Sequence, residues 1–275
     1  MLTGLMKDLQ YTFRGLRRSP LFAATAIISL ALGIGANAAI FSLLHQVLLQ
    51  RLPVRDPQQL VLLDAPGPNH GMFNGDHVMS LPFYKQVRDE NQVFSGVLAR
   101  EPIYASFAAG NTTDRAYGEI VSGNYFEMLG VGAAQGRTIV PADDGAFGSG
   151  PVIVLGYGFW QRRFGGDPGI VGKSIELNAK PMTVIGVAAP KFEGFEAGRS
   201  SDFYVPISMA TQLTQIDAMA AMNMGVNSPF NHWLNIFARL KPGLKREQAE
   251  AGINVLFHQI REAELKAMPH PSQGS

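Results

Sequence analysis

The first part of the chain carries a long, uninterrupted run of apolar residues. From Ser19 to Gln50 no residue has a formal charge, and the most apolar window extends from Leu21 to Leu44. A helix needs about 20 apolar residues to cross a bilayer, and each large apolar side chain favours insertion by roughly 0.3 to 0.6 kcal/mol. The pattern predicts a transmembrane helix in residues 20–50 rather than the buried helix of a soluble protein.

The residues before this run have the pattern of a short amphipathic helix. Apolar side chains recur at helical spacing at Leu2, Leu5, Met6, Leu9, Phe13 and Leu16. Most charged residues lie off this stripe, and Pro20 suits a change of direction into the span. We therefore predict a leader helix in residues 1–19 that lies on the cytoplasmic membrane surface.

Charges on the two sides of the span predict its orientation. The basic residues that precede it are Lys7, Arg14, Arg17 and Arg18, against one acid, Asp8. Downstream of the span, nearby aspartates soon balance the arginines. The positive-inside rule places the N-terminus in the cytoplasm and everything after about Gln50 outside.

A cleaved signal peptide is the alternative interpretation of this segment. Ala36-Asn37-Ala38 has the small-x-small pattern of a cleavage site. The charged leader is long, however, and the apolar run continues from Ala39 to Leu44 beyond that site. Cleavage would leave this apolar stretch as the new N-terminus, so the pattern favours an uncleaved anchor.

The span also carries a weakly polar stripe. Small or polar residues recur at a spacing of four at Thr25, Ser29, Gly33 and Asn37. Such stripes let transmembrane helices approach closely and hydrogen-bond across the contact. One reading is an ordinary anchor with chance small residues; the other is that this helix packs against transmembrane helices outside these residues.

After the span the apolar positions form short runs. Strands are predicted at residues 60–63, 96–109, 114–121, 151–155, 203–205 and 234–240, with a hairpin at 174–187 around Asn178-Ala179-Lys180. Helices are predicted at residues 81–91, 125–129, 157–164 and 245–266. The elements predict an α+β fold for an outer domain of residues 51–275, with helices packed on a mixed sheet.

Composition narrows the function classes. The chain has 275 residues, 46% of them hydrophobic, and a net charge of +1 from 23 basic and 22 acidic residues. The basic residues are scattered, which argues against a nucleic-acid partner. Because cysteine is absent, disulfides, thiolate catalysis and Cys-type metal sites are excluded.

Catalytic and cofactor motifs are not evident. Gly172-Lys173-Ser174 follows a glycine-rich stretch, but its spacing from Gly166 exceeds a phosphate-binding loop by one residue. His70, Asp76 and His77 share a glycine-rich loop without a recognised metal-ligand spacing. No nucleophile-elbow sequence is present. We expect no enzyme activity, no cofactor and no metal.

Three local clusters of side chains stand out in the outer domain. The acids pair locally as Asp143/Asp144 and Glu193/Glu196, and in glycine- and proline-rich loops such pairs are more typical of solvated turns than of acid–base catalysis. A dense patch is formed by Trp160, Arg162, Arg163 and Phe164. Core packing with solvent-facing arginines is one interpretation of this patch, and a contact surface for a partner subunit is the other.

Several long motifs resemble one protein family. The opening "DLQYTFRGLRRSPLFAATAIISLALGIGANAAIFSLLHQVLLQRLPVRDPQQLVLL" is similar to the start of MacB/FtsX-type ABC transporter permeases, in particular the duplicated orphan permeases. The stretches "GNYFEMLGVGAAQGRTIVPADDG", "PVIVLGYGFWQRRFGGDPGIVGKSIELNAKPMTVIGVAAPKFEGF" and "WLNIFARLKPGLKREQAEAGINVLFHQI" resemble the periplasmic core of that family. The motifs occur in the family's order over nearly the whole chain.

The resemblance implies a membrane permease component of an ABC-type export or mechanotransmission system. Such permeases have one N-terminal span, a large extracytoplasmic domain and further FtsX-like spans in the bacterial plasma membrane. Some members have an ABC ATPase fused or encoded separately, whereas the duplicated class often lacks an obvious one. A homodimer with membrane lipid around its spans is implied by the family alone.

The chain departs from the family pattern because the later spans are absent, so we expect a fragment that is incomplete at its C-terminus. The alternatives are a single-span extracytoplasmic binding module that acts alone, and a membrane-tethered hydrolase.

Overall fold

The chain divides into two compact units. The computed structural model describes residues 20–44, 53–64, 77–110, 112–196, 198–216 and 225–267. The first unit, called the anchor, is Met1–Arg51, and the second, called the outer unit, is Leu52–Ser275. The predicted leader helix and its basic residues Lys7, Arg14, Arg17 and Arg18 lie outside the described residues.

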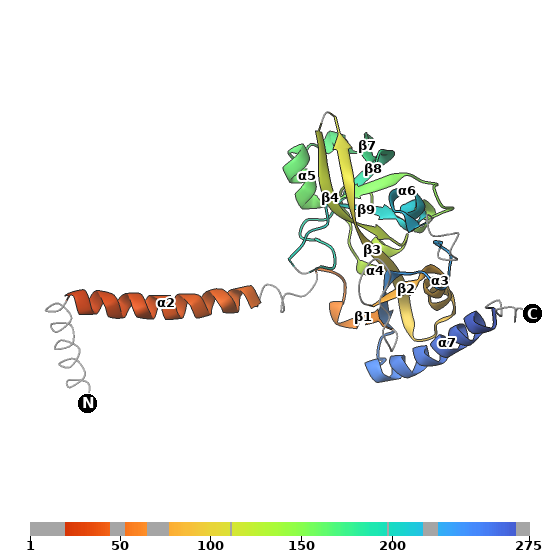
Figure 1. Cartoon of the computed structure of the whole chain (residues 1–275), viewed down its shortest axis with the longest axis horizontal. Helices are drawn as coiled ribbons and strands as arrows, with labels where there is room; N and C mark the ends of the chain where they lie inside the picture. Colours follow the sequence, from red (N-terminus) through yellow and green to blue (C-terminus); the bar gives the residue numbers. More distant parts are fainter. Residues whose placement is uncertain are drawn as a thin grey trace, which may run out of the picture. The chain divides into compact units, whose positions relative to one another are not determined.

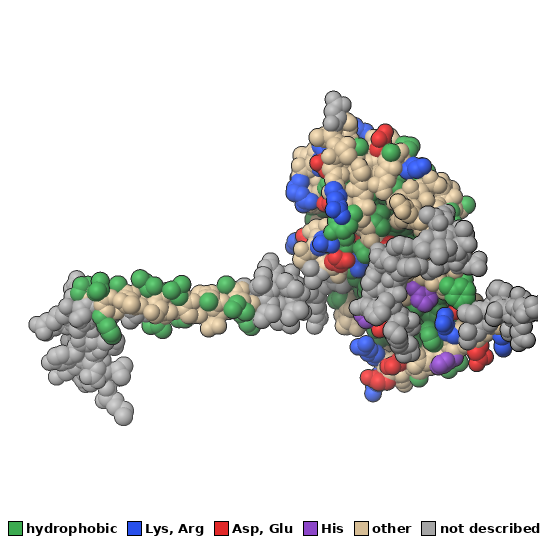
Figure 2. All heavy atoms as spheres, in the orientation of Figure 1, with side chains coloured by type: hydrophobic (Ala, Val, Ile, Leu, Met, Phe, Trp, Pro, Cys, Tyr) green, Lys and Arg blue, Asp and Glu red, His purple; other side chains and the backbone are tan. Residues whose placement is uncertain are grey.

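The anchor contains one long apolar helix, α2 (Pro20–Leu44). Its segment Pro20–Phe41 has a mean hydropathy of 1.9 and is, within the described ranges, the helix long and apolar enough to cross a membrane. Figure 2 shows hydrophobic and uncharged side chains along its whole length. Large apolar side chains face outward, with Leu21 85% and Phe22 74% exposed. Lipid would cover this surface, since apolar area is unfavourable in water.

The outer unit is organised by one ten-stranded sheet, shown in Figure 1, with the order β1-β10-β3-β4-β9-β6-β8-β5. Along this path the strands are β1 (Leu60–Leu63), β10 (His232–Leu240), β3 (Phe94–Ala109), β4 (Thr112–Val121), β9 (Phe203–Pro206), β6 (Val152–Leu155), β8 (Lys180–Ala188) and β5 (Ala133–Gly136). Off the path, β2 (Val78–Ser80) pairs with β10, and β7 (Ser174–Leu177) pairs with β3 and β8.

The helices of the outer unit are α3 (Leu81–Glu90), α4 (Tyr125–Leu129), α5 (Tyr157–Phe164), α6 (Ala210–Leu213) and α7 (Arg246–Ala267). Short 3-10 turns occupy Pro57–Gln59, Pro141–Asp143, Pro168–Ile170 and Ile207–Met209. The pairs β4–β9 and β6–β8 are parallel, whereas β1–β10, β10–β3 and β3–β4 are antiparallel. The predicted α+β fold with a mixed sheet is confirmed.

Local sequence explains where α3 begins and ends. The Ser80 hydroxyl oxygen accepts a hydrogen bond from the Phe83 N–H at 3.2 Å, as an N-cap does. Pro82 lies in the first turn, where no intrahelical N–H bond is needed. At the other end, the Asn91 side chain donates to the Val87 carbonyl at 2.8 Å. The buried residues of this helix are Leu81, Phe83, Tyr84 and Val87.

The hairpin of β7 and β8 is confirmed at the predicted turn. Asn178 and Ala179 have φ angles of 50° and 60°, as the type I′ turn of a two-residue hairpin requires. The Asn178 side chain also accepts from the Ser106 N–H at 2.8 Å and donates to the Leu213 carbonyl at 2.8 Å. These bonds hold the turn against β3 and α6. The short elements β2, β5 and α6 were not predicted.

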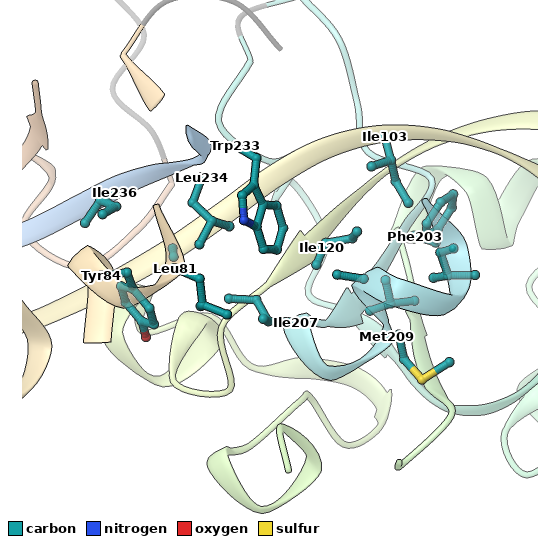
Figure 3. Close-up of a cluster of buried hydrophobic side chains, with 14 of the residues drawn as sticks. Leu81, Tyr84, Ile103, Ile120, Phe203, Ile207, Met209, Trp233, Leu234 and Ile236 are labelled. Carbon is teal, nitrogen blue, oxygen red and sulfur yellow. The ribbon is translucent and has the colours of Figure 1, made fainter. Parts of the chain in front are cut away.

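Each face of the sheet carries its own hydrophobic core. The larger core runs along the face covered by α3, α5, α6 and α7, and includes Phe83, Phe107, Trp160 and Ile260. Figure 3 shows part of it, with Ile103 of β3 and Ile120 of β4 between Trp233 of β10 and Phe203 of β9. The smaller core lies on the opposite face under α4 and includes Tyr125, Phe126, Phe192 and Tyr204.

Candidate functional site

The long strand β3 pairs with β10 along its first half and with β4 along its second half. Its residues Phe94–Arg100 pair with β10, and its residues Arg100–Ala109 pair with β4. Arg100 is therefore opposite Asn235 on one edge and opposite Val121 on the other. Sixteen residues of strand span about 50 Å at roughly 3.3 Å per residue. We call the crossing at Arg100 the junction.

A buried ion pair lies at the junction. Arg100 Nη1 is 3.5 Å from Glu119 Oε2, and these side chains are 8% and 1% exposed. Glu119 also accepts hydrogen bonds from the Tyr125 hydroxyl at 3.0 Å and the Ser201 hydroxyl at 2.6 Å. A buried charge is tolerated only when it is paired and hydrogen-bonded. The carboxylate of Glu119 thus ties β3, β4, α4 and the segment before β9 together.

The surroundings of the junction shift the pKa values of Arg100 and Tyr125. Burial alone would lower the pKa of Arg100, but Glu119 and the other acidic groups around it outweigh burial and raise that pKa. Burial, followed by the charge of Glu119, raises the pKa of the Tyr125 hydroxyl well above its ordinary value. Arg100 therefore stays charged and Tyr125 stays a hydrogen-bond donor over the physiological pH range.

A loop between β8 and β9 closes the junction from outside. We call residues 189–202 the strap; the structure describes all of it except Ala197. Phe195 stacks on Phe237 of β10 with ring centroids 4.2 Å apart, and the Arg100 guanidinium lies 5.6 Å from the Phe195 ring centre. Phe192 stacks on Tyr204 at 5.7 Å. The strap thus contacts strands on both sides of the junction.

One glycine allows the strap to lie this close. Gly194 has a φ angle of +94°, and a Cβ atom there would lie 2.4 Å from Glu119 Oε1 and 2.7 Å from Ser201 Oγ. Any larger residue would have to push the strap away from the ion pair. The Ser201 N–H donates to the Glu193 carbonyl at 2.9 Å, which closes the strap into a compact turn around Gly194.

Beside the strap, arginines stack on two tyrosines of β3 and β4, of which Tyr104 is 49% exposed and Tyr117 is buried. The Tyr104 and Tyr117 rings are 5.3 Å apart. Arg115 lies 4.2 Å above the Tyr104 ring centre, and Arg199 of the strap lies 4.8 Å above that of Tyr117. Stacking of this kind holds guanidinium groups in place while leaving them in contact with solvent. Glu196 lies 3.8 Å from Arg199 at one end of the row.

The predicted patch around α5 separates into a buried and an exposed part. Trp160 is 6% exposed, and its Nε1 donates to the Asp167 carbonyl at 2.9 Å. The Arg163 side chain, 23% exposed, pairs with Asp114 at 3.0 Å, and the Arg162 side chain, 63% exposed, pairs with Asp202 at 3.0 Å. Figure 2 shows Lys and Arg side chains gathered on the side of the outer unit that carries α5. Contact with a partner through Trp160, Arg162 and Arg163 stays a prediction. Of the three side chains, Arg162 is the most exposed.

The other local motifs of the sequence form ion pairs and hydrogen bonds within the outer unit. Asp143 pairs with Arg137 at 2.6 Å, and Asp144 accepts from the N–H groups of Gly123 and Ser208 at 3.1 and 2.9 Å. Lys173 of the glycine-rich stretch is exposed and lies 3.4 Å from Asp167. Among the described residues, no group of three or more His, Asp or Glu side chains is placed to hold a metal ion. His70 and Asp76 lie outside these residues.

The polar stripe of the anchor faces outward along α2. The residues Thr25, Ser29, Gly33 and Asn37 are all exposed. The Thr25 hydroxyl donates to the Leu21 carbonyl at 2.6 Å, so its hydrogen-bonding need is met inside the helix. Contact between this stripe and other transmembrane helices stays a prediction.

Sequence reasoning missed the junction. Arg100 and Glu101 interrupt a long apolar strand pattern, and that interruption was the available signal. The partner carboxylate of Glu119 lies on the next strand of the hairpin, and Tyr125 follows on α4. Their meeting depends on the β3–β4 register and on the strap, which periodicity does not determine.

Comparisons with known proteins define the class of this outer unit. It shares its fold with the periplasmic region of MacB from Actinobacillus actinomycetemcomitans, with a TM-score of 0.54 and 18% identity over 74% of this chain and 84% of that one. The probable export ATP-binding/permease protein MacB of Pseudomonas entomophila (strain L48) is 30% identical over 139 residues, which are 50% of this chain and 19% of that protein. The present chain therefore spans about a fifth of the length of that relative.

The sequence model of the MacB-like periplasmic core domain matches residues 23–256. The chain belongs to this family, as the resemblance in its motifs predicted. With α2 and the outer unit, it is a membrane-anchored protein with an extracytoplasmic domain of an ABC transporter permease.

Proposed function

We propose that this chain is the outer-domain portion of a permease component in an ABC-type export or mechanotransmission system. Its outer unit would transmit conformational change and contact substrate or partners. It would do so without a catalytic group of its own. The observation that carries the proposal is the junction, where one strand, a buried ion pair and the strap link the β10 side and the β4 side of a continuous sheet.

The physical case for transmission rests on stiffness. Displacement at one end of a domain reaches the other end only if the material between them does not yield, and well-packed interiors yield little. β3 crosses the junction without a break, and the larger core continues past it on one face. The strap fastens the opposite face. A binding module that acts alone would not need such a connection.

The proposal extends to location and partners. The chain would lie in the bacterial plasma membrane with its N-terminus in the cytoplasm and its outer unit in the periplasm. The stripe Thr25/Ser29/Gly33/Asn37 would pack against FtsX-like transmembrane helices. A homodimer and an ABC ATPase would complete the assembly, with membrane lipid around the spans. The family resemblance supports these partners.

The absence of native cysteine makes orientation directly testable. Single-cysteine variants Lys7→Cys and Thr113→Cys would be treated in spheroplasts with a membrane-impermeant maleimide. We expect Thr113→Cys to react at once and Lys7→Cys to react only after lysis. The opposite pattern would reverse the proposed orientation.

Transmission is tested by the distance between the β3–β4 hairpin on one side of the junction and α7 on the other. Thr113, at the start of β4, and Val255, which is exposed on α7, would carry spin labels in the full chain. We expect one narrow distance distribution, and a broader one when Glu119→Leu removes the ion pair. A distribution that is already broad, and that this substitution leaves unchanged, would contradict a transmitting role and favour the single-span binding module.

A further inference from the structure

The chain enters the outer unit through a short stretch, residues 53–59, which we call the entry segment. The Arg55 N–H donates to the Leu129 carbonyl of α4 at 2.7 Å. Val54 is partly buried and packs against the smaller core. Strand β1 begins after this segment, at Leu60. The entry segment therefore contacts α4 before the chain joins the sheet.

Arg239 of β10 fastens the entry segment to α4. The residue is 8% exposed. Its Nη1 donates to the Asp56 carbonyl at 3.0 Å, and its Nη2 donates to the Met128 carbonyl at 3.0 Å. The two carbonyls belong to segments far apart along the chain, and the planar guanidinium holds both of them at once. We call these two bonds, together with the bond from Arg55 to Leu129, the entry clasp.

The entry clasp supplies donors to the C-terminal end of α4. The last carbonyl groups of a helix have no partner within the helix, and the Met128 and Leu129 carbonyls accept from Arg239 and from the Arg55 N–H instead. Gly130 ends the helix with a φ angle of +70°, and a Cβ atom there would lie 3.0 Å from the Arg55 Cβ. The end of α4 and the entry segment are thus in close contact.

Helix α4 connects the entry clasp to the junction. The helix has five residues, which span about 7.5 Å at 1.5 Å per residue. At its start, the Tyr125 hydroxyl donates to Glu119 at 3.0 Å. Tyr125, Phe126 and Leu129 are buried in the smaller core. Because a close-packed interior transmits strain, a displacement of the entry segment reaches the ion pair of the junction through α4.

We propose that Arg239 is the positioning residue through which the membrane anchor acts on the junction. The entry clasp passes a displacement of the entry segment to α4, and α4 passes it through Tyr125 to Glu119. The role of the clasp in transmission rests on the proposed function, whereas its geometry does not.

Arg239→Lys tests the clasp, because lysine keeps the charge but lacks the planar fork that holds two carbonyls. Lys241→Met is the matched control, since Lys241 donates to a carbonyl outside the entry segment, that of Gln92, at 2.7 Å. Spin labels at Pro53 and Val255, both exposed, would report the position of the entry segment in the full chain. An unfastened segment samples more positions, so we expect the distance distribution to broaden about twofold in Arg239→Lys and to stay unchanged in Lys241→Met.

The label pair Thr113/Val255 separates this inference from the proposed function. Arg239→Lys should leave the Thr113/Val255 distribution narrow, because the ion pair of the junction is intact. Broadening of both distributions would indicate a general loss of packing, and an unchanged Pro53/Val255 distribution would mean that other contacts hold the entry segment. Either result would overturn the proposal. A Thr113/Val255 distribution that is broad in the unsubstituted chain would refute the proposed function, whereas the Pro53/Val255 pair decides the clasp.

A glycine provides a second variant that leaves Arg239 in place. Gly130→Ala places a Cβ atom against Arg55, whereas Gly243→Ala has a φ angle of +79° and no neighbour within 4 Å. We expect Gly130→Ala to broaden the Pro53/Val255 distribution and Gly243→Ala to leave it unchanged. Equal effects of the two substitutions would overturn the contact between the helix end and the entry segment.

Urea unfolding of the full chain measures whether α4 links the clasp to the ion pair. Substitutions at distant sites without a shared partner usually have additive effects on the free energy of unfolding. Arg239→Lys and Glu119→Leu both release α4, so we expect the double variant to lose less free energy of unfolding than the two single losses added. Additive losses would show that α4 does not connect the two sites and would overturn the proposal.

Discussion

The buried ion pair at the junction makes a quantitative prediction about stability. Replacing Glu119 by leucine removes the carboxylate that faces Arg100 at 3.5 Å and accepts from Tyr125 and Ser201. The Arg100 side chain is 8% exposed, so water cannot replace the lost partner without a change in packing. Removing one member of a buried pair costs about 3–5 kcal/mol when the other charge is left uncompensated. The partly exposed Glu196, 3.8 Å from Arg100 Nη2, replaces Glu119 only in part.

A second variant separates the cost of leaving Arg100 unpaired from the net contribution of the ion pair to stability. Replacing both members with apolar residues of similar volume is often neutral or stabilising. The double variant Arg100→Met/Glu119→Leu should therefore be less destabilised than Glu119→Leu alone. Asp89→Asn is the matched control, because Arg88 and Asp89 are 2.7 Å apart but 43% and 57% exposed. An exposed pair of this kind contributes about 0–1 kcal/mol.

Tryptophan fluorescence during urea unfolding of the full chain in detergent measures these effects. The chain has two tryptophans, and both Trp160 and Trp233 are buried in the outer unit. The signal therefore reports the outer unit and not the anchor. In a thermal scan we expect Glu119→Leu to lower the Tm by about 6–20 °C, at about 2–4 °C per kcal/mol for a unit of this size.

Two results would refute the reasoning about the junction. In the first, Glu119→Leu lowers the free energy of unfolding by no more than Asp89→Asn does. In the second, the double variant loses as much free energy of unfolding as Arg100→Met and Glu119→Leu lose when their separate effects are added. Either outcome would mean that solvent or another side chain contacts Arg100 when Glu119 is removed. The ion pair would then not couple the β10 side of the sheet to the β4 side.

Three further substitutions test the surroundings of the junction and the core, each by urea unfolding of the full chain. Gly194→Ala should destabilise more than Gly198→Ala, because both have positive φ angles but only Gly194 has neighbours within 3 Å of an added Cβ; equal losses would show that strain alone matters. Burial raises the pKa of Glu101 well above its ordinary value, so stability falls as pH rises above the unfolded pKa of about 4.3. Glu101→Gln should accordingly exceed the wild type in stability at pH 8 and approach it near pH 4; a difference that does not vary with pH would contradict this. Trp160→Phe should cost about 1 kcal/mol through the lost indole hydrogen bond, whereas an unchanged midpoint would mean that this hydrogen bond adds nothing to stability.

The sequence by itself determined the features that depend on local patterns. An uncharged apolar run predicts a membrane-spanning helix, because each side chain contributes independently to insertion. The start of α3 follows from Ser80 and Pro82, and the turn of β7 and β8 follows from Asn178. In each case the deciding contacts lie within a few residues along the chain, so their chemistry is visible in a short window of sequence.

Only the tertiary structure decided the junction and the order of the strands. Arg100, Glu119 and Ser201 come from three separate segments, and they meet because β4 pairs with both β3 and β9 while the strap closes over them. Likewise, nothing in the sequence of β1 shows that it pairs with β10, which lies far away along the chain. Strand order and register are fixed by the burial of side chains from distant segments in shared cores, and local periodicity does not contain that information.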